Sequence, residues 1–282
     1  MMEIPEIVFN ISMLGFVAGS MITLGLGLTL AQIIAPFKKI RIVLRALIAN
    51  FIIVPLFALG IVEWIPVPEG VRIGIILVSL GGGAPFIPMI VATAKGHLGG
   101  AVGLMMLLLI VTIFFMPIAV PVMLPGVSVS SWGIAKSLLS IMLVPLVLAL
   151  FIRARFPGFA QRIQPFVAIF TNISILILII AVLYLYTETI ITSVDILPVI
   201  ILFFVGAMFI GYVSGGKRKD MRHIFSVGTG LRNPPVAILV ASQNFSTQPI
   251  AAIVPLLVAI VGILILLPLA IITGRKVARS IR

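Results

Sequence analysis

A single arginine, Arg232, stands inside a long apolar stretch and is the residue of this chain best suited to bind an anion. It belongs to the sequence GTGLRNPP, Gly228–Pro235, in a hydrophobic run that begins at Ile224 and continues past Val240. A guanidinium keeps its proton in proteins, carries five N–H donors and costs at least about 2.5 kcal/mol in the middle of a membrane helix. Carbonyl oxygens, amides or a bound anion must therefore face it.

The apolar segments offer this arginine no acidic partner. The acidic residues all lie in connections or near segment ends: Glu3, Glu6, Glu63, Glu69, Glu188, Asp195 and Asp220. The partners that we expect are unwound backbone carbonyls, the amides of Asn50 and Asn233, and a bound anion. A structural arginine that only clamps carbonyls is the alternative.

The amino-acid composition indicates whether the chain folds in a membrane or in water. Of its 282 residues, 62% are hydrophobic and 9% are charged, and the mean hydropathy is +1.36. This is too little polar surface to cover a water-soluble globule of the same size. The apolar runs are close to the roughly 20 residues that span a bilayer as α-helix, and no barrel-like alternation is present. We expect an all-α integral membrane protein, whose first segment is a retained helix and not a removed signal peptide.

Nine apolar segments are long enough to cross the membrane. They are residues 7–34, 42–62, 71–94, 98–123, 132–152, 166–186, 190–213, 224–245 and 250–272. Lys and Arg gather in alternate connections and at the C-terminus, whereas most acids lie in the other connections and at the N-terminus. By the positive-inside rule this is a multi-pass protein of the cell (inner) membrane, with the N-terminus outside and the C-terminus in the cytoplasm.

The residue inventory argues against several classes of function. The net charge of +12 sits in short loops without interleaved aromatic residues, so the expected partner is the lipid bilayer and not nucleic acid. Cys is absent, and His97 and His223 fall at segment ends. A metal site or an intramembrane enzyme needs buried ligands, carboxylates or a nucleophile with a base. We therefore expect no cofactor, no metal and no enzymatic activity.

The third and eighth segments contain sequences that interrupt helices. GGGAPFIP at Gly81–Pro88 and GTGLRNPP at Gly228–Pro235 share the spacing G-x-G-x-x-x-x-P. The two segments run in opposite directions, which indicates an inverted repeat of segments one to four and six to nine. Proline removes a donor and glycine relaxes the dihedrals, so both segments should unwind and cross at mid-membrane. The alternative is that the glycines only allow close packing and the prolines only kink the helices.

The crossing point is the predicted substrate site, because unwound peptide groups are tolerated in a membrane only where protein, water or a solute supplies partners. The predicted substrate-binding residues are Asn50, Gly83, Ala84, Pro85, Phe86, Asn172, Gly228, Thr229, Gly230, Arg232 and Asn233. Asn172 lies beside Thr171 and Ser174, and these three side chains either face the crossover or bond to one another across helices.

Several stretches, in order along nearly the whole chain, resemble the bile acid:sodium symporter family and its bacterial relatives. They are LGLGLTL at 24–30, ANFIIVPLFA at 49–58, AKGH at 94–97, VPLVLALFI at 144–152 and GTGLRN at 228–233. The resemblance implies a panel domain of residues 1–35 and 131–188. It implies a core domain of residues 36–130 and 189–282 with two crossing broken helices. It also implies transport of organic anions by elevator-like or rocking alternating access.

The chain departs from this family where sodium is implied to bind. Relatives place a carboxylate at Gly228, an amide at Arg232, a Ser-Asn pair at Ile87 and Pro88, and hydroxyls at Ala101 and Met105; here only Asn50 keeps a polar oxygen. Sodium favours several hard oxygen ligands and a carboxylate. We therefore expect transport of a small carboxylate or sulfonate without sodium coupling, with Arg232 replacing the cation.

Two alternatives remain open at this point. One is a sodium-coupled symporter with a degenerate site, and the other is an anion channel or sensor on the transporter fold. The sequence does not name the solute, the direction of transport or the oligomeric state, and a monomer is compatible with it.

Overall fold

The computed structural model describes residues 4–29, 31–32, 40–125, 130–192 and 194–280. Across these ranges the protein is helical and contains no strand. The α-helices are α1 (Ile4–Gly27), α3 (Ile40–Ile48), α4 (Val54–Trp64), α5 (Glu69–Leu80), α6 (Ile87–Thr93), α7 (Leu98–Met123), α8 (Ser131–Leu138), α9 (Val144–Arg155), α10 (Pro157–Thr192), α11 (Leu197–Ser214), α12 (Lys219–Gly230), α13 (Pro234–Asn244) and α14 (Ile250–Ser280). Two π-helical turns, η2 (Ala49–Ile53) and η3 (Leu139–Leu143), and one 3₁₀ turn, η4 (Val194–Ile196), join neighbouring helices.

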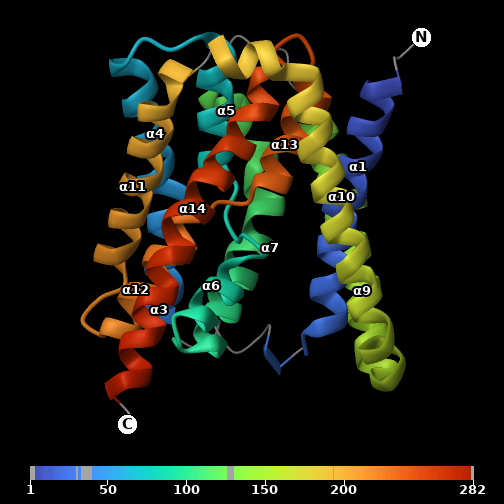
Figure 1. Ribbon diagram of the computed structural model, residues 1–282, viewed down its shortest axis with the longest axis vertical. Coiled ribbons are helices and arrows are strands. Elements are labelled where there is room, and N and C mark those ends of the chain that lie inside the picture. Colours follow the sequence, from blue (N-terminus) through green and yellow to red (C-terminus); the bar gives the residue numbers. More distant parts are fainter. Residues whose placement is uncertain (1–3, 30, 33–39, 126–129, 193, 281–282) are drawn as a thin grey trace.

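The all-α membrane class is confirmed. Among the described residues, eight helical stretches are long and apolar enough to cross a membrane, α12 and α13 being counted as one stretch. The predicted third segment is not among them, because it is divided into α5 with 12 residues and α6 with 7 residues. The two chain ends lie at opposite ends of the molecule (Figure 1), as an odd number of crossings requires. The count of nine crossings stays a prediction.

Helix boundaries differ most from expectation at α10 and α11. The sequence predicts a helix over residues 166–186, but α10 begins at Pro157, because proline suits the first turn of a helix. Ala160 in these added turns is buried in a small apolar cluster with Leu26 and Ala149. At the predicted end of this segment, Tyr186 leaves the helical conformation with a φ of −126° and a ψ of 21°, and the helix resumes after this kink and continues to Thr192. α11 therefore begins seven residues later than predicted. α1 ends at Gly27 and residues 28–29 are not helical, so the first helix is shorter than the predicted segment 7–34. Residue 34 itself and the domain boundary after residue 35 lie outside the described residues.

Prolines set where several helices begin. A proline stands in the first turn of α4, α6, α9, α11 and α13, where its missing N–H and fixed φ are tolerated. Pro55 follows the π-helical turn η2, in which the N–H of Val54 donates to the carbonyl of Ala49. The next donor in this pattern would be the nitrogen of Pro55, which has no hydrogen. The carbonyl of Asn50 is therefore left without a helical partner.

The helices form two packed groups. α1, α9 and α10 pack on one another at one side of the molecule (Figure 1), whereas α5, α13 and α14 pack together and α11 packs on α12. The groups touch through α1 on α13 and through α7 on α8. They correspond in outline to the panel and core implied by the resemblance. Packing alone does not test whether they move as two domains, so that division stays a prediction.

The interruption after α5 depends on Gly83 and on α7. Gly83 has a φ of +83°, and a Cβ added there would lie 2.4 Å from the backbone nitrogen of Leu109. Thr112 of α7 binds the same interruption: its Oγ1 accepts from the N–H of Gly82 at 2.8 Å and donates to the carbonyl of Gly82 at 3.2 Å. α7 thus supports the unwound part of the third segment.

We expect Gly83→Ala to lower the melting temperature of the purified protein. Left-handed backbone strain of about 1 kcal/mol for a residue with a Cβ adds to the clash with the α7 backbone. Gly60→Ala is the matched control, because a Cβ at Gly60 meets no atom within 4 Å. Melting both variants in the same detergent checks the prediction. A Gly83→Ala protein that melts together with Gly60→Ala contradicts it.

Candidate functional site

The two broken segments cross where the sequence predicts. The interruptions are residues 81–86 between α5 and α6 and residues 231–233 between α12 and α13. The N–H of Asn233 donates to the carbonyl of Gly81 at 2.9 Å. The side-chain Nδ2 of Asn233 donates to the carbonyls of Gly82 and Gly83 at 3.3 Å each. The two interruptions therefore hold each other directly.

Arg232 lies inside this crossing with 1% of its surface exposed. Each of its five N–H groups has an acceptor within the protein. Nε donates to the carbonyl of Val78 at 3.3 Å, Nη1 to Asn50 Oδ1 at 2.6 Å and to the carbonyl of Thr229 at 3.4 Å, and Nη2 to the carbonyl of Asn50 at 3.2 Å and to the carbonyl of Ser79. No N–H of this guanidinium is left for a solute in the conformation described.

The acceptors explain why a cation is stable at this depth. Val78 and Ser79 belong to the last turn of α5, and Thr229 belongs to the last turn of α12. Helix C-termini expose carbonyls without helical donors and carry a partial negative charge. The carbonyl of Asn50 is free for a different reason, the proline five residues further along. Arg232 is thus a permanent cation held by the carbonyl ends of interrupted helices.

Asn50 links the second segment to the crossover. Its side chain is buried, and its Nδ2 donates to the carbonyl of Ala46 at 2.9 Å and to Thr229 Oγ1 at 3.2 Å. Its Oδ1 accepts from Arg232. Of the amides expected to face the arginine, Asn50 does so and Asn233 does not.

Asn233 has a free acceptor. Its side chain is buried, and its Oδ1 has no hydrogen-bond partner among the described residues. The two backbone carbonyls at its Nδ2 settle which end of the amide is the nitrogen, because a carbonyl requires a donor. A buried acceptor of this kind calls for a donor from a water or a solute.

Ten of the eleven predicted site residues gather at the crossing or bind it. Two of them, Pro85 and Phe86, are partly exposed. The other eight are buried: Asn50, Gly83, Ala84, Gly228, Thr229, Gly230, Arg232 and Asn233. Six residues from the two interrupted segments, together with residues of α14, border a cavity of about 10 Å³, room for roughly one water. A small organic anion does not fit into that cavity in this conformation.

Asn172 is placed differently. It lies on the exposed face of α10, apart from the crossing. Its neighbours face α1: Thr171 is buried, and its Oγ1 lies 3.4 Å from Thr23 Oγ1. The geometry therefore favours bonding across helices for Thr171, and the structure does not bring Asn172 to the other predicted residues.

Sequence reasoning missed three residues that hold the site. Val78 and Ser79 bind Arg232 through their backbone carbonyls, which the side-chain type does not reveal. The only signal in the sequence is their position just before Gly81–Gly83. Thr112 is a hydroxyl inside an otherwise apolar segment, which is a weak signal because such a group often bonds within its own helix.

The positions at which the resemblance implies sodium ligands are packed with apolar groups. Ile87, Ala101 and Met105 have no exposed surface. A Cβ added at Gly228 would lie 2.6 Å from Leu104 Cδ2, so a larger side chain there requires Leu104 to move. The described part of the chain also contains no group of three or more His, Asp or Glu residues that could hold a metal ion.

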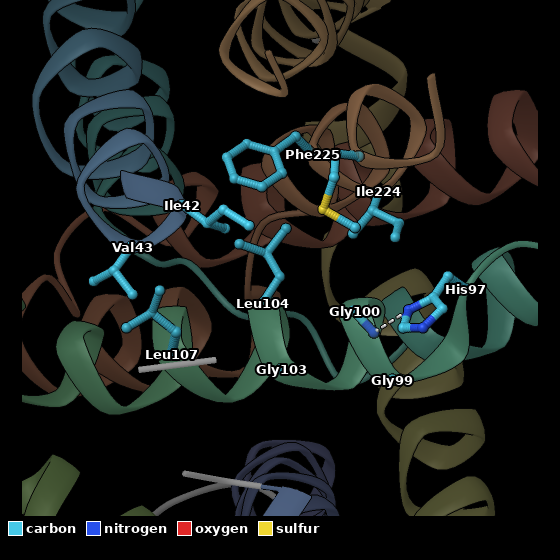
Figure 2. A pocket seen from close by; sticks show the side chains of 11 residues that line it. Ile42, Val43, His97, Gly99, Gly100, Gly103, Leu104, Leu107, Ile224 and Phe225 are labelled. Carbon is cyan, nitrogen blue, oxygen red and sulfur yellow. Dashed lines mark hydrogen bonds between the residues drawn. The ribbon is translucent and has the colours of Figure 1, made fainter. Parts of the chain in front are cut away.

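A larger cavity lies next to this apolar region. It has a volume of about 250 Å³ and lies between α3, α7 and α12. Figure 2 shows Leu104 and Phe225 within it and His97 at the start of α7, where its Nδ1 accepts from the N–H of Gly100 at 2.9 Å. Leu104 also packs on Gly228 of the crossing, so this one side chain separates the cavity from the crossing.

We expect Arg232→Met to destabilise the protein by at least about 3 kcal/mol, because it leaves several buried carbonyls and an amide oxygen without donors. Arg232→Lys should lie in between, since an ammonium retains the charge but has three donors. Denaturation in detergent, followed by circular dichroism, checks this order. Arg155→Gln, at an exposed position, serves as the control. Equal stability of Arg232→Met and Arg155→Gln would show that the guanidinium does not hold the crossing.

Comparison with known families gives one match. The model of the Sodium Bile acid symporter family matches residues 13–193, which include the first interruption and end before the second. A search of curated proteins finds no match.

Proposed function

Because the chain belongs to the Sodium Bile acid symporter family, we propose that it is a secondary transporter that moves a small organic anion by alternating access without sodium coupling. The observation that supports the absence of coupling is the bonding of Arg232, whose five N–H groups all bind oxygens at the crossing. Membership of this family supports a transport function in general. The class of solute, the absence of sodium coupling and the alternating-access movement are our proposal.

Electrostatics at the crossing disfavours sodium binding. Carbonyls at the ends of α5 and α12 and the Asn50 oxygens are the type of ligand that sodium prefers, but here a covalently attached cation binds them. A guanidinium does not dissociate with each transport cycle. The packing of Ile87, Ala101 and Met105 leaves the other implied position without oxygen ligands. The sodium-coupled alternative therefore lacks ligands at both places.

The charge of Arg232 also favours an anionic solute. No Asp or Glu side chain contacts Arg232 among the described residues, so the crossing keeps a net positive charge in a medium that screens charge poorly. Arg232 acts on the solute through this charge and not through a direct hydrogen bond. Direct contacts come from the other predicted residues of the interruptions, and a solute hydroxyl supplies the donor that Asn233 Oδ1 lacks.

The small volume at the crossing requires a second conformation. A cavity of about 10 Å³ admits one water and no organic anion, so the solute binds when the two helix groups separate around the crossing. A channel or sensor on the same fold remains the other candidate. Saturable flux with counterflow distinguishes a carrier from a channel. We propose the cell (inner) membrane as the location, with the N-terminus outside.

We expect uptake of an organic anion into proteoliposomes to be unchanged when choline replaces sodium on both sides. The fixed guanidinium supplies the charge that a sodium ion would otherwise bring. Radiolabelled uptake at matched osmolarity measures the effect, with protein-free liposomes as the blank. A fall to the blank level in choline would overturn sodium independence without touching family membership.

We also expect small carboxylates and sulfonates to raise the melting temperature, and amines of similar size to leave it unchanged. Binding to the folded state stabilises by about 2.7 kcal/mol at a hundred-fold excess over Kd. Hydroxylated carboxylates should give the larger shift, because they supply a donor for Asn233 Oδ1. Anions and amines that shift the melting temperature equally would remove the charge argument for the solute class.

A further inference from the structure

A second large cavity lies away from the crossing, between α6, α11, α12 and α14. Its volume is about 420 Å³, within the roughly 300–1,000 Å³ typical of small-molecule sites. Its inner wall is apolar and includes Ile90, Val91, Met208 and Leu266. None of its lining residues comes from α1, α9 or α10. It is therefore separate from any crevice between the two helix groups.

The mouth of this cavity carries an uncompensated cation. Lys95, His223 and Asp220 lie there. The carboxylate of Asp220 is occupied by Arg218, which donates to it at 3.1 Å and 2.6 Å. Lys95 joins neither of the two ion pairs found in the described residues. An anionic group at the mouth would meet the ammonium of Lys95, because the carboxylate of Asp220 is already paired with Arg218.

The backbone of Lys95 gives no local reason for a lysine. Its φ is +57°, a left-handed conformation that follows the end of α6. The N–H of Gly96 donates to the carbonyl of Val91 at 2.9 Å, which closes the helix end. Glycine or asparagine suits this position better than a lysine. Strained residues of this kind concentrate at functional sites.

The wall of the cavity reaches the outside of the bundle at Leu269. Leu269 of α14 lines it and has about half of its surface exposed, at 50%, whereas Leu266 and Ala270 on the inner face are buried. α14 runs along the outside of the bundle (Figure 1), a surface that faces lipid in a membrane. An acyl chain can therefore enter sideways past Leu269, while its head remains at the level of Lys95.

We propose that this cavity binds one acyl chain of an anionic phospholipid, with the lipid phosphate against the ammonium of Lys95. The apolar wall suits an acyl chain, the half-exposed Leu269 lies where that chain would enter from the bilayer, and the cationic mouth suits the phosphate. A bound chain would contact α6 and α12, the two half-helices that reach the crossing from this end. It would also lie beside Ser226, whose hydroxyl donates to the carbonyl of Met208 at 3.0 Å. The lipid would thus fasten α11 and α12 to α6 and α14.

Native mass spectrometry of the full-length protein, released from mixed phosphatidylglycerol and phosphatidylcholine micelles, tests the proposal without any transport measurement. We expect the wild type to retain phosphatidylglycerol in preference to phosphatidylcholine. Lys95→Asn keeps a residue suited to the left-handed backbone and removes the charge, so retention should fall about five-fold. Lys95→Arg should retain the lipid. Lys136→Asn, an exposed lysine of α8 outside the cavity, should match the wild type.

Two further variants separate loss of lipid from loss of fold. Lys95→Gly relieves the backbone strain, so it should melt at or above the wild-type temperature and still lose the lipid. Ala270→Phe fills the cavity and should remove the retained phosphatidylglycerol while Lys95 is present. Retention equal to the wild type in both Lys95→Asn and Ala270→Phe overturns the proposal. Displacement of phosphatidylglycerol by an equal concentration of palmitate overturns the choice of a phospholipid.

Discussion

The structure depends on the burial of one guanidinium. Removing Arg232 from water is costly, and the cost is offset only because five oxygens are arranged around its five N–H groups. Four of those oxygens are backbone carbonyls, and each lies where a helix ends or is distorted; the carbonyl of Val78 also accepts from the N–H of Gly81. The interruption of α5, the end of α12 and the π-helical turn before Pro55 are therefore parts of one arrangement.

Hydrogen bonds also explain why unwound backbone is stable inside a membrane protein. Asn233 satisfies three carbonyls of the first interruption, and Thr112 of α7 satisfies one N–H and shares one of those carbonyls. These peptide groups of the first break are thus bonded to the partner segment or to α7. The buried Oδ1 of Asn233 stands out against this background, because it is the acceptor that the crossing leaves for a water or a solute.

A fixed cation changes what a transporter of this family can do. A dissociable ion carries the energy of its own gradient into each cycle, whereas a guanidinium attached to the chain carries none. The proposed transporter then moves its anion according to the anion's own gradient and the membrane potential, which contributes about 2.3 kcal/mol per charge per 100 mV. Permanent occupation of the carbonyls also keeps the crossing intact when no solute is bound. In this proposal, the loss of sodium coupling and the constant rigidity of the crossing both follow from one residue, Arg232.

Local properties of the sequence were sufficient for the all-α membrane class and for the positions of the two interruptions. Hydropathy reports the solvent around each segment, and Gly and Pro act on the dihedrals of their own residues, so neither requires knowledge of the fold. The approximate depth of Arg232 followed from the same reasoning, although the sequence left open whether it binds a solute or clamps carbonyls. The extent of α10 was not predictable, because its added turns are stabilised by contacts with α1 and α9.

Tertiary structure decided everything that depends on residues distant in the chain. The partners of Arg232 lie up to 182 positions away, and three of them bind it only through their carbonyls, which no residue type marks. Asn172 was expected near the crossing because of its type, but the rotation of α10 against α1 turns it to the exposed face. The sequence by itself determined where the chain breaks and where its buried charge sits. Packing alone determined what surrounds that charge, because the direction of a carbonyl or a side chain is set by the helices that meet there.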